Sequence, residues 1–467
     1  MATAIAVAAL AGVLTVQAVM IRQPGHLPGR EPVLWLVMAW WGLGFIAATA
    51  LLWAAPRRIA VGLLVGGAIV IQGSAMARGP QLSDDYYRYA WDARVQLAGT
   101  DPYRYVSIDP RLDRLHDRWL WPDPAQCEAI GRQAGCTRLN YPRAHTIYPP
   151  VAQAWFVLVD VLPGPPREHK QQFYASLASL GLMVMLMRML STAGRDPRYA
   201  AFYAWSPVAG VDVGSDGHVD VVAALFALGG LALLSRAAAL GRRRAAVGGG
   251  LLGAAIAVKL YPALLLPAAI RRRPVVVAAT AGGVVAWSYL PHALAVGTGV
   301  VGFLPEYLKV EGYDQGSRFV LLSLVGLSGS AAKAVAVAVL AGVTATVLGA
   351  DARRTPPIRA ALYLVGAALL IATPAQPWYS LLLVALAAHE ARPEWLAVAA
   401  AAYPAYVAHF VRLPGGAYEV SQIAYGAAAT IVLAVTVPRW REGRTPSAPS
   451  PWPAVRPSRP RPVGGPS

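Results

Sequence analysis

Acidic, basic and aromatic residues alternate in the stretch 83–94, and together they could perform acid–base chemistry. On a helix, Asp85, Arg88 and Asp92 would share one face, because residues three, four and seven apart lie on the same side. A carboxylate that is partly removed from water beside a cation can serve as a general base. Asp85 and the adjacent Asp84 are therefore candidate bases. Surface salt bridges and an interfacial belt of tyrosine and tryptophan would explain the same residues without catalysis.

A second cluster of ionisable residues combines Asp216, His218 and Asp220 in a glycine-containing turn that precedes an apolar segment. Ionisable groups next to long apolar segments are costly to bury and are usually functional. Glycine also lets the backbone approach a ligand closely. The Asp-x-His-x-Asp spacing is compatible with a metal, a sugar hydroxyl or a phosphate. A single histidine between two aspartates is not a metal signature, so we do not expect a metal to be required here.

Lys259 is a cation within an apolar region and is followed by Tyr261 and Pro262. An ammonium group is a compact charge with three donors, which suits a phosphate. A lysine that snorkels toward the membrane surface is the alternative explanation. The pattern makes Lys259 and Tyr261 candidates for an anion-binding site.

Three further segments combine aromatic rings with hydrogen-bonding side chains. Tyr148 precedes two prolines, Glu306 lies among several aromatic residues, and Gln376 and Trp378 flank a single proline. A sugar offers apolar faces for stacking and hydroxyl groups that need polar partners, so Glu306, Gln376 and Trp378 could bind a carbohydrate. On local physics the Tyr148 segment is mostly scaffold. An interfacial aromatic belt and helix-initiating prolines explain the same segments without a ligand.

The composition indicates that membrane-spanning helices carry these groups. Of the 467 residues, 56% are hydrophobic and only 14% are charged, whereas a soluble domain has about a quarter charged residues. Apolar stretches long enough to span a bilayer, about 20 residues each, recur from Met1 to Val437. The sequence therefore predicts an all-α polytopic membrane protein. A disordered chain, a coiled coil and an ordinary cytosolic enzyme are excluded.

We expect about 11–14 transmembrane helices in four regions of the chain. Residues 1–77 form N-terminal transmembrane helices, 78–149 a long extracytoplasmic catalytic loop, 150–437 a helix bundle with short outer loops, and 438–467 a disordered Pro/Arg-rich cytoplasmic tail. The approximate spans are 2–21, 33–55, 59–77, 150–163, 171–190, 219–236, 245–258, 262–270, 275–292, 331–349, 358–374, 378–391, 395–411 and 418–437. The chain between 245 and 270 should form a short hairpin that is broken near Lys259.

Arginine clusters in short segments between the apolar stretches predict the orientation. The chain has 41 Lys and Arg residues against 24 Asp and Glu residues, a net charge of +17. The clusters are Arg57–Arg58, 242–244, 271–273, 353–354 and the tail from Arg439. The positive-inside rule places these clusters in the cytoplasm. We therefore expect a multi-pass plasma-membrane protein whose active site faces the extracytoplasmic side, and no nucleic-acid partner.

Both cysteines of the chain, Cys127 and Cys136, fall in the long outer loop. Two nearby cysteines outside the cytoplasm are a reasonable disulfide pair. Two free thiols are the alternative. A zinc site is disfavoured because there is no second cysteine pair, and His116 and His145 are isolated.

With these motifs in order, the chain resembles the GT-C superfamily of integral-membrane glycosyltransferases that use polyprenyl-phosphate sugars. It looks most like mannosyltransferases of the actinobacterial type. The resemblance covers roughly residues 78–380 and rests on the order of the motifs more than on any one of them. These motifs are DYYRYAWD at 85–92, DPY at 101–103, TIYPP at 146–150, SDGHVD at 215–220, KLYP at 259–262 and QPWY at 376–379.

The resemblance implies a reaction and a base. The family places a catalytic Asp or Glu in the first large extracytoplasmic loop, a role that carries over to Asp85, with Asp84 as the neighbouring alternative. The protein would be a hexosyltransferase that moves a sugar, mannose in the enzymes it most resembles, from a polyprenyl phosphate to a glycan or glycolipid. The configuration at the anomeric carbon would be inverted. Proton removal by a positioned base is typically worth about 10²–10⁴-fold.

The resemblance also implies the residues that bind the donor and the molecules that take part. The phosphate would contact Lys259, Arg88 and His218. The full set of candidate donor-binding residues is Arg88, Asp92, Tyr148, Asp216, His218, Asp220, Lys259, Tyr261, Glu306, Gln376 and Trp378. The expected partners are the polyprenyl-phosphate sugar, the glycan or glycolipid acceptor and membrane lipids. No cofactor is required by this reaction, although a divalent metal is compatible with it.

Two other functions fit parts of the sequence. A transporter or flippase of a lipid-linked saccharide would use similar residues, but transporters often contain inverted repeats, and no second copy of the stretch 84–94 occurs. A noncatalytic subunit, in which Asp85 only forms a salt bridge, is the other possibility. An enzyme that uses a nucleotide sugar would need a soluble domain with a Gly-rich phosphate loop, which the sequence lacks.

Overall fold

The computed structural model describes residues 1–23, 31–235, 240–352 and 355–441, and the regular elements in these ranges are all helical. Seven helices there are long and apolar enough to cross a membrane. Shorter apolar helices pack among them. The predicted class, an all-α polytopic membrane protein, is confirmed.

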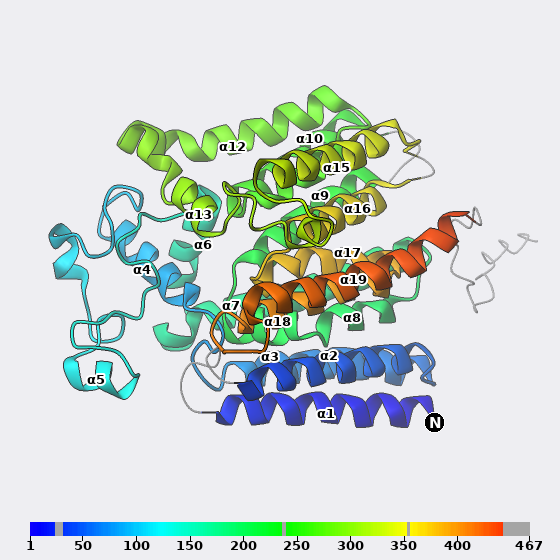
Figure 1. Ribbon diagram of the computed structural model, residues 1–467, viewed down its shortest axis with the longest axis horizontal. Helices are drawn as coiled ribbons and strands as arrows, with labels where there is room; N and C mark the ends of the chain where they lie inside the picture. The colour runs from blue at the N-terminus through cyan, green and yellow to red at the C-terminus, as the bar shows by residue number, and fades with distance from the viewer. Residues whose placement is uncertain (24–30, 236–239, 353–354, 442–467) are drawn as a thin grey trace, which may run out of the picture.

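The N-terminal helices form one side of the bundle (Figure 1): α1 (Ala2–Arg22), α2 (Glu31–Leu52) and α3 (Arg57–Ala75). Their polar side chains are used for interhelical hydrogen bonds. Gln17 of α1 donates to the carbonyl of Ile71 in α3 at 2.9 Å. Trp40 of α2 donates its indole N–H to the carbonyl of Trp205 at 3.0 Å. Such bonds satisfy donors that would otherwise be buried without a partner.

The remaining helices differ greatly in length. They are α6 (Pro150–Val161), α7 (Arg167–Thr192), η2 (Pro197–Ala200), α8 (Ala201–Ala204), η3 (Val208–Ser215), α9 (Asp220–Ser235), α10 (Arg242–Val258), η4 (Tyr261–Leu265), α11 (Leu266–Ala269), α12 (Pro274–Val296), η5 (Gly297–Val301), α13 (Leu304–Val310), α14 (Val320–Ser323), α15 (Gly329–Gly349), α16 (Pro357–Ala372), η6 (Pro377–Ser380), α17 (Leu381–Glu390), η7 (Pro393–Trp395), α18 (Leu396–Val407) and α19 (Gly416–Arg441). Each span predicted from the sequence contains a helix. Short 3-10 turns such as η4 and η6 occur where a proline fixes the backbone and removes an N–H donor.

Residues 78–149 lie at one end of the bundle (Figure 1) and contain α4 (Asp85–Leu97), η1 (Pro110–Leu115) and α5 (Pro124–Ala129). This long loop has a small hydrophobic core of its own. The buried residues of that core are Trp91, Val95, Leu112, Leu120 and Leu139. The loop is therefore a folded unit attached to the helix ends.

The arginine clusters in the described residues lie at the end of the bundle opposite the long loop. Helix α3 begins at Arg57 and runs toward the loop, and α10 begins at Arg242 and runs in the same direction. Helix α12 follows the third cluster, and its far end contacts the loop. The Arg353–Arg354 cluster and residues 442–467, which belong to the tail predicted to be disordered, lie outside the described residues. The described arginine clusters therefore share one end of the bundle, which is the arrangement expected of segments that follow the positive-inside rule.

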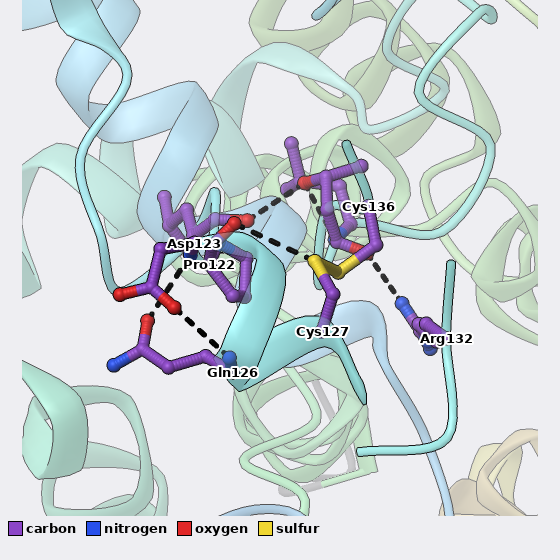
Figure 2. The surroundings of a disulfide bond; sticks show 9 residues. Pro122, Asp123, Gln126, Cys127, Arg132 and Cys136 are labelled. Carbon is purple, nitrogen blue, oxygen red and sulfur yellow. Dashed lines mark hydrogen bonds between the residues drawn. A yellow bond between two sulfur atoms is a disulfide. The ribbon is translucent and has the colours of Figure 1, made fainter. Parts of the chain in front are cut away.

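Figure 2 shows the pairing expected for the two cysteines: Cys127 and Cys136 form a disulfide, with their Cα atoms 5.9 Å apart. Helix α5 carries the first of them and begins with a capping box. The Asp123 side chain accepts from the backbone N–H of Gln126 at 2.9 Å, and the Gln126 side chain accepts from the backbone N–H of Asp123 at 3.2 Å. Cap and disulfide together give this part of the loop a defined conformation.

Candidate active site

A cavity of about 800 Å³ lies between the long loop and the adjoining helix ends. Ionisable and aromatic residues from several of the predicted motifs line it. Asp84, Asp85, Lys259, Gln376 and Trp378 are all among the lining residues. The fold therefore brings residues that are far apart in the sequence into one site.

Asp85 lies in the first turn of α4 and is partly exposed to this cavity, with 15% of its side chain accessible. Its Oδ1 accepts a hydrogen bond from the side-chain amide of Asn140 at 2.5 Å. Its Oδ2 lies 3.8 Å from Nδ1 of His218. A negative charge in the first helical turn is also favoured by the helix dipole. The carboxylate is thus oriented and open to the cavity, as a general base requires.

Asp84 immediately precedes α4 and also lines the cavity, but it has a different partner. Its Oδ2 lies 3.0 Å from Nη2 of Arg132. A carboxylate that is paired with a guanidinium has its charge compensated and accepts a proton less readily. The geometry therefore favours Asp85 over Asp84 as the base.

Lys259 follows α10 in an extended conformation, and the chain then turns into η4, the break expected from the sequence. Its Nζ lies 3.3 Å from Oδ2 of Asp220, whose side chain is fully buried. The ammonium group also lies over the rings of Tyr148 and Tyr379, 5.2 and 5.5 Å from their centroids. A carboxylate and two aromatic faces thus hold one cation at the cavity wall.

His218 lies in the turn between η3 and α9, is fully buried and does not line the cavity. Its ring stacks on Trp378, with centroids 4.1 Å apart and planes at 18°. Its Nδ1 is 3.3 Å from the hydroxyl of Tyr89, and its Nε2 has no hydrogen-bond partner in the described part of the chain. Burial, and then the charge of Lys259, lower the pKa of His218. The buried imidazole packs on Trp378 and does not reach the cavity in which the sequence analysis expected it to bind the phosphate.

Asp216 and Gly217 fix the entry of the long loop and lie outside the lining of the cavity. Asp216 is buried, and its Oδ1 accepts from the backbone N–H groups of Gln81 at 2.6 Å and Leu82 at 3.2 Å. Gly217 has φ +66°, and a Cβ there would lie 3.0 Å from the ring of Tyr86. The close backbone approach expected at this glycine is therefore made to an aromatic side chain of the protein.

Arg88 and Asp92 form a buried ion pair, with Nε and Oδ1 2.9 Å apart. Oδ2 of Asp92 also accepts from Thr146 Oγ1 at 2.5 Å and from Gln153 Nε2 at 2.9 Å. These bonds connect α4 to the chain entering α6. Arg88 reaches the cavity wall, whereas Asp92 does not. The pair mainly joins the two ends of the long loop.

A second polar group on the cavity wall joins the chain after α13 to the start of η6. Gln376 donates through Nε2 to Glu311 Oε1 at 2.7 Å and accepts through Oε1 from Arg318 Nη2 at 3.1 Å. Arg318 and Glu311 also pair directly at 3.0 Å. The sequence indicated Gln376 but not its two partners. Their mutual contacts link distant segments, so no local spacing could have revealed them.

The other predicted residues differ in their proximity to the cavity. Tyr148 and Tyr261 line it, whereas Glu306 is exposed on α13 and does not. Burial, and then the charge of Asp85, raise the pKa of Tyr148, so its hydroxyl stays protonated and can act as a donor. Asn140, which the sequence analysis did not select, contacts the candidate base directly.

The cavity also has a large apolar wall, formed by residues of η4 and α16. A second cavity of about 450 Å³ shares Leu260 and Leu264 with it and reaches Leu340 of α15 and Leu364 of α16. The cavity with the ionisable groups and this apolar cavity therefore adjoin each other at η4. Such an arrangement suits a ligand with a charged head and an apolar chain.

Within the described residues, no group of three or more His, Cys, Asp and Glu side chains is arranged to hold a metal ion. Asp216 binds backbone N–H groups, Asp220 faces Lys259, and His218 stacks on Trp378. Nδ1 of His218 lies 4.0 Å from Oδ2 of Asp220, but Asp216 faces the backbone of Gln81 and Leu82, so the three side chains of the Asp-x-His-x-Asp motif do not form one ligand set.

The helical membrane fold and the cavity at its loop end fit the class of integral-membrane glycosyltransferases of the GT-C type. Residues 146–374 match the family model of glycosyltransferase family 87, which is a GT-C-like family. The match confirms the resemblance stated above and supports a membrane glycosyltransferase activity. It includes His218, Lys259 and Arg318 but ends before Gln376 and begins after Asp85. No curated protein and no solved structure matches the chain.

Proposed function

We propose that the protein transfers a sugar from a polyprenyl-phosphate donor to a hydroxyl group of an extracytoplasmic glycan or glycolipid, with mannose as the sugar. The observation that carries the proposal is that Asp85 and Lys259 line one cavity whose remaining wall is largely apolar. An acceptor hydroxyl needs a base, a departing phosphate needs a cation, and a polyprenyl chain needs apolar contacts. The cavity combines all three.

The proposed reaction is a single displacement. The carboxylate of Asp85 takes the proton of the acceptor hydroxyl while the hydroxyl oxygen forms a bond to the anomeric carbon. The bond from that carbon to the phosphate oxygen breaks, and its electron pair leaves with the polyprenyl phosphate. Because the nucleophile enters opposite the leaving group, the configuration at the anomeric carbon is inverted. The base accounts for about 10²–10⁴-fold of the rate.

Lys259 is the cation best placed to stabilise the departing phosphate. It lines the cavity, and its position is set by Asp220 and by the faces of Tyr148 and Tyr379. Negative charge develops on the phosphate as the bond breaks, and a preorganised cation stabilises that charge without rearrangement. Arg88 is a weaker candidate because its guanidinium is bound by both Asp92 and the carbonyl of Ala144 and is less exposed than the Lys259 side chain.

The polyprenyl chain would follow the apolar wall between η4, α15 and α16. The second cavity continues this wall and shares Leu260 and Leu264 with the first. The chain passes from the hydrocarbon of the bilayer to this wall, so the contact orients the donor and adds little hydrophobic free energy. The sugar and phosphate would then lie at the polar end, near Lys259.

The acceptor would contact the wall formed by Glu311, Arg318 and Gln376. These three side chains are planar, charge-balanced as a group and fixed by their mutual hydrogen bonds. Tyr307 and Tyr379 adjoin them and share a hydrogen bond of 2.6 Å. Planar polar groups beside aromatic rings can bind hydroxyls and stack on a sugar face. A neutral carbohydrate suits this wall better than a second phosphate does.

The charge distribution and the disulfide support an active site on the extracytoplasmic face of the plasma membrane. The arginine clusters lie at the end of the bundle opposite the cavity, which is the pattern of cytoplasmic segments. The disulfide lies in the loop that covers the cavity, and such bonds persist in oxidising compartments. Both observations favour the same orientation.

A flippase for the same lipid-linked sugar is less well supported. The ionisable residues that line the cavity come from the long loop and from the helix ends beside it. A transporter is expected to place its binding site near the membrane midplane, between repeated halves.

The direct test uses the purified protein in lipid vesicles with a radiolabelled polyprenyl-phosphate mannose and a membrane extract as the source of acceptors. We expect the label to pass to an acceptor, with release of one polyprenyl phosphate for each sugar transferred. Movement of intact labelled donor across the vesicle membrane, with no release of polyprenyl phosphate, would support the flippase and contradict the proposal.

A further inference from the structure

The disulfide turn, residues 127–136, reaches the two carboxylates at the start of α4. Arg132 of this turn, which Figure 2 labels, donates through Nη2 to Oδ2 of Asp84 at 3.0 Å. Asn140, shortly after the turn, donates through Nδ2 to Oδ1 of Asp85 at 2.5 Å. The two adjacent carboxylates are thus held by two different residues of one short segment.

Hydrogen bonds and packing fix the chain between the disulfide turn and Asn140. Thr137 Oγ1 donates to the carbonyl of Leu120 at 2.8 Å, and the backbone N–H of Arg138 donates to the same carbonyl at 2.9 Å. Leu139 is buried in the small core of the long loop. The position of Asn140 is therefore determined by the folded loop.

The backbone directly after Asn140 adopts an unfavourable conformation. Tyr141 has φ +42°, in the left-handed region that residues other than glycine rarely occupy. Such a conformation persists only where the surrounding contacts enforce it, and it is common at functional sites. Here it accompanies the placement of the Asn140 amide against Asp85.

We propose that Asn140 is a positioning residue for the general base Asp85, and that the disulfide turn holds Asn140 in place. The inference rests on the proposed function, because it assigns Asn140 a role in that reaction. An N–H donated to a carboxylate stabilises its ionised form. Because Asn140 occupies Oδ1, Oδ2 is the oxygen that receives the proton of the acceptor hydroxyl. Arg132 satisfies Asp84 separately, so the amide is not shared between the two carboxylates.

Other titratable groups also face Asp85, and each of them is kept in an Asn140 variant. They are Tyr89 of α4, Tyr141 of the loop, Tyr148 before α6, His218 before α9, Asp220 of α9 with its partner Lys259, and Tyr406 of α18. Asp84 precedes Asp85 in the chain, and Arg132 of the disulfide turn pairs with Asp84. A change in the pH response of an Asn140 variant therefore reports the lost amide contact.

The test measures kcat and the donor KM for the wild type, Asn140→Ala and Asn140→Asp between about pH 5 and about pH 9, with radiolabelled polyprenyl-phosphate mannose. Gln133→Ala is the matched control, because Gln133 is an exposed amide within the disulfide turn. We expect Asn140→Ala to lower kcat by about tenfold, since a hydrogen bond to a charged group is lost. The donor KM should stay unchanged and the acid limb of the kcat profile should move to higher pH. Gln133→Ala should behave as the wild type.

Asn140→Asp keeps the size of the side chain and tests the same contact if the alanine variant folds poorly. It should move the acid limb further than Asn140→Ala does, because it places a like charge against Asp85. The double variant Cys127→Ala/Cys136→Ala should lie between the wild type and Asn140→Ala in both kcat and pH profile.

Three outcomes would contradict parts of this account and can be told apart. Unchanged kcat and pH profiles in both Asn140 variants would overturn the role of Asn140 and leave the proposed function intact. Wild-type behaviour of the cysteine double variant would overturn the role of the disulfide turn. No transfer by the wild-type protein would overturn the proposed function and, with it, the role of Asn140.

Discussion

The neighbouring carboxylates Asp84 and Asp85 have different surroundings. Asp84 faces the guanidinium of Arg132, whereas Asp85 accepts from a neutral amide and faces the cavity. A guanidinium stabilises the ionised carboxylate more strongly than an amide does. Asp85 is therefore the residue that we propose as the base.

Variants of Lys259 and Asp220 can distinguish a role of Lys259 in phosphate binding from a role in the stability of the fold. Lys259→Met leaves the buried Asp220 carboxylate without its partner, and the loss of one member of a buried pair costs about 3–5 kcal/mol of folding free energy. The variant should melt at a lower temperature and lose transfer activity. Lys259→Met/Asp220→Asn should recover much of the melting temperature but not the activity, because no cation faces the phosphate. Recovery of both would show that Lys259 serves the fold alone.

His218 gives the folded protein a specific pH dependence. Burial and Lys259 lower its pKa, although Asp85 and Asp220 lie 3.8 and 4.0 Å away and oppose that shift. The folded state therefore binds this proton less readily than the unfolded state, in which the pKa is about 6.5. Stability should be complete above about pH 6.5 and should decrease as the pH falls below it.

Melting temperatures in detergent at several pH values check this expectation. His218→Gln removes the titrating group, so its melting temperature should fall less on acidification than that of the wild type. Equal falls in the two proteins, or a wild type that becomes more stable in acid, would contradict the assignment of a neutral imidazole.

The helical elements could be predicted from the sequence far better than the contacts between them. Long apolar stretches have few structural solutions in a bilayer, because every backbone polar group must be satisfied within the segment. The break at Lys259 was also predictable, since Pro262 cannot continue a helix. In contrast, tertiary contacts place Asn140, Glu311 and Arg318 in the site. No sequence motif around these residues predicts that position.

Glu306 and Glu311 illustrate this limit. Both acids occur among aromatic residues of one outer segment, and the sequence favoured the first. In the structure Glu306 is exposed, whereas Glu311 pairs with Arg318 and Gln376 at the cavity wall. Which acid faces inward depends on how α13 packs, and its short length gives no clear periodicity.

The position of α13 depends on a close backbone contact at Gly302, so a substitution there should displace this helix. Gly302 has φ +57°, and a Cβ there would lie 1.9 Å from the carbonyl oxygen of Thr146. Gly302→Ala must therefore displace the segment that carries the Glu311 wall. We expect a higher KM for the acceptor and a nearly unchanged KM for the donor.

Gly299 provides the matched control for this variant. A Cβ at Gly299 would meet only the side chain of Val296, at 3.7 Å, which is an ordinary contact. Gly299→Ala should leave both KM values as in the wild type. An unchanged acceptor KM in Gly302→Ala would show that this wall does not bind the acceptor.

The two ends of the molecule differ: the cavity, lined by ionisable and aromatic residues, lies beside the long loop, and the described arginine clusters lie at the opposite end. This asymmetry follows from the order of charges along the chain, so the sequence alone was sufficient to predict it. Helices α3, α10 and α12 run in the predicted direction, but α7 runs in the opposite one. It begins beside the long loop, where Arg167 pairs with Asp117, and the chain that follows it meets Arg57 through Asp196. The side of the membrane on which the cavity opens is a prediction that labelling can test.

Cysteine labelling in intact cells can show on which side of the membrane the long loop and its cavity lie. Arg111 lies exposed in η1 of the long loop, and Arg243 lies exposed at the start of α10. A membrane-impermeant maleimide should label Arg111→Cys in intact cells and Arg243→Cys only after permeabilisation. The reverse pattern would place the cavity on the cytoplasmic side and contradict the proposed location.

The central claim is that the Asp85 carboxylate removes the proton from the acceptor, and a comparison of kcat values tests it most directly. Asp85→Asn keeps the shape of the side chain but removes the base, so kcat should fall by about 10²–10⁴-fold while the protein remains folded and binds the donor. Asp84→Asn should change kcat by much less, because Asp84 is already paired with Arg132. Near wild-type transfer by Asp85→Asn, or a larger loss in Asp84→Asn, would contradict the account.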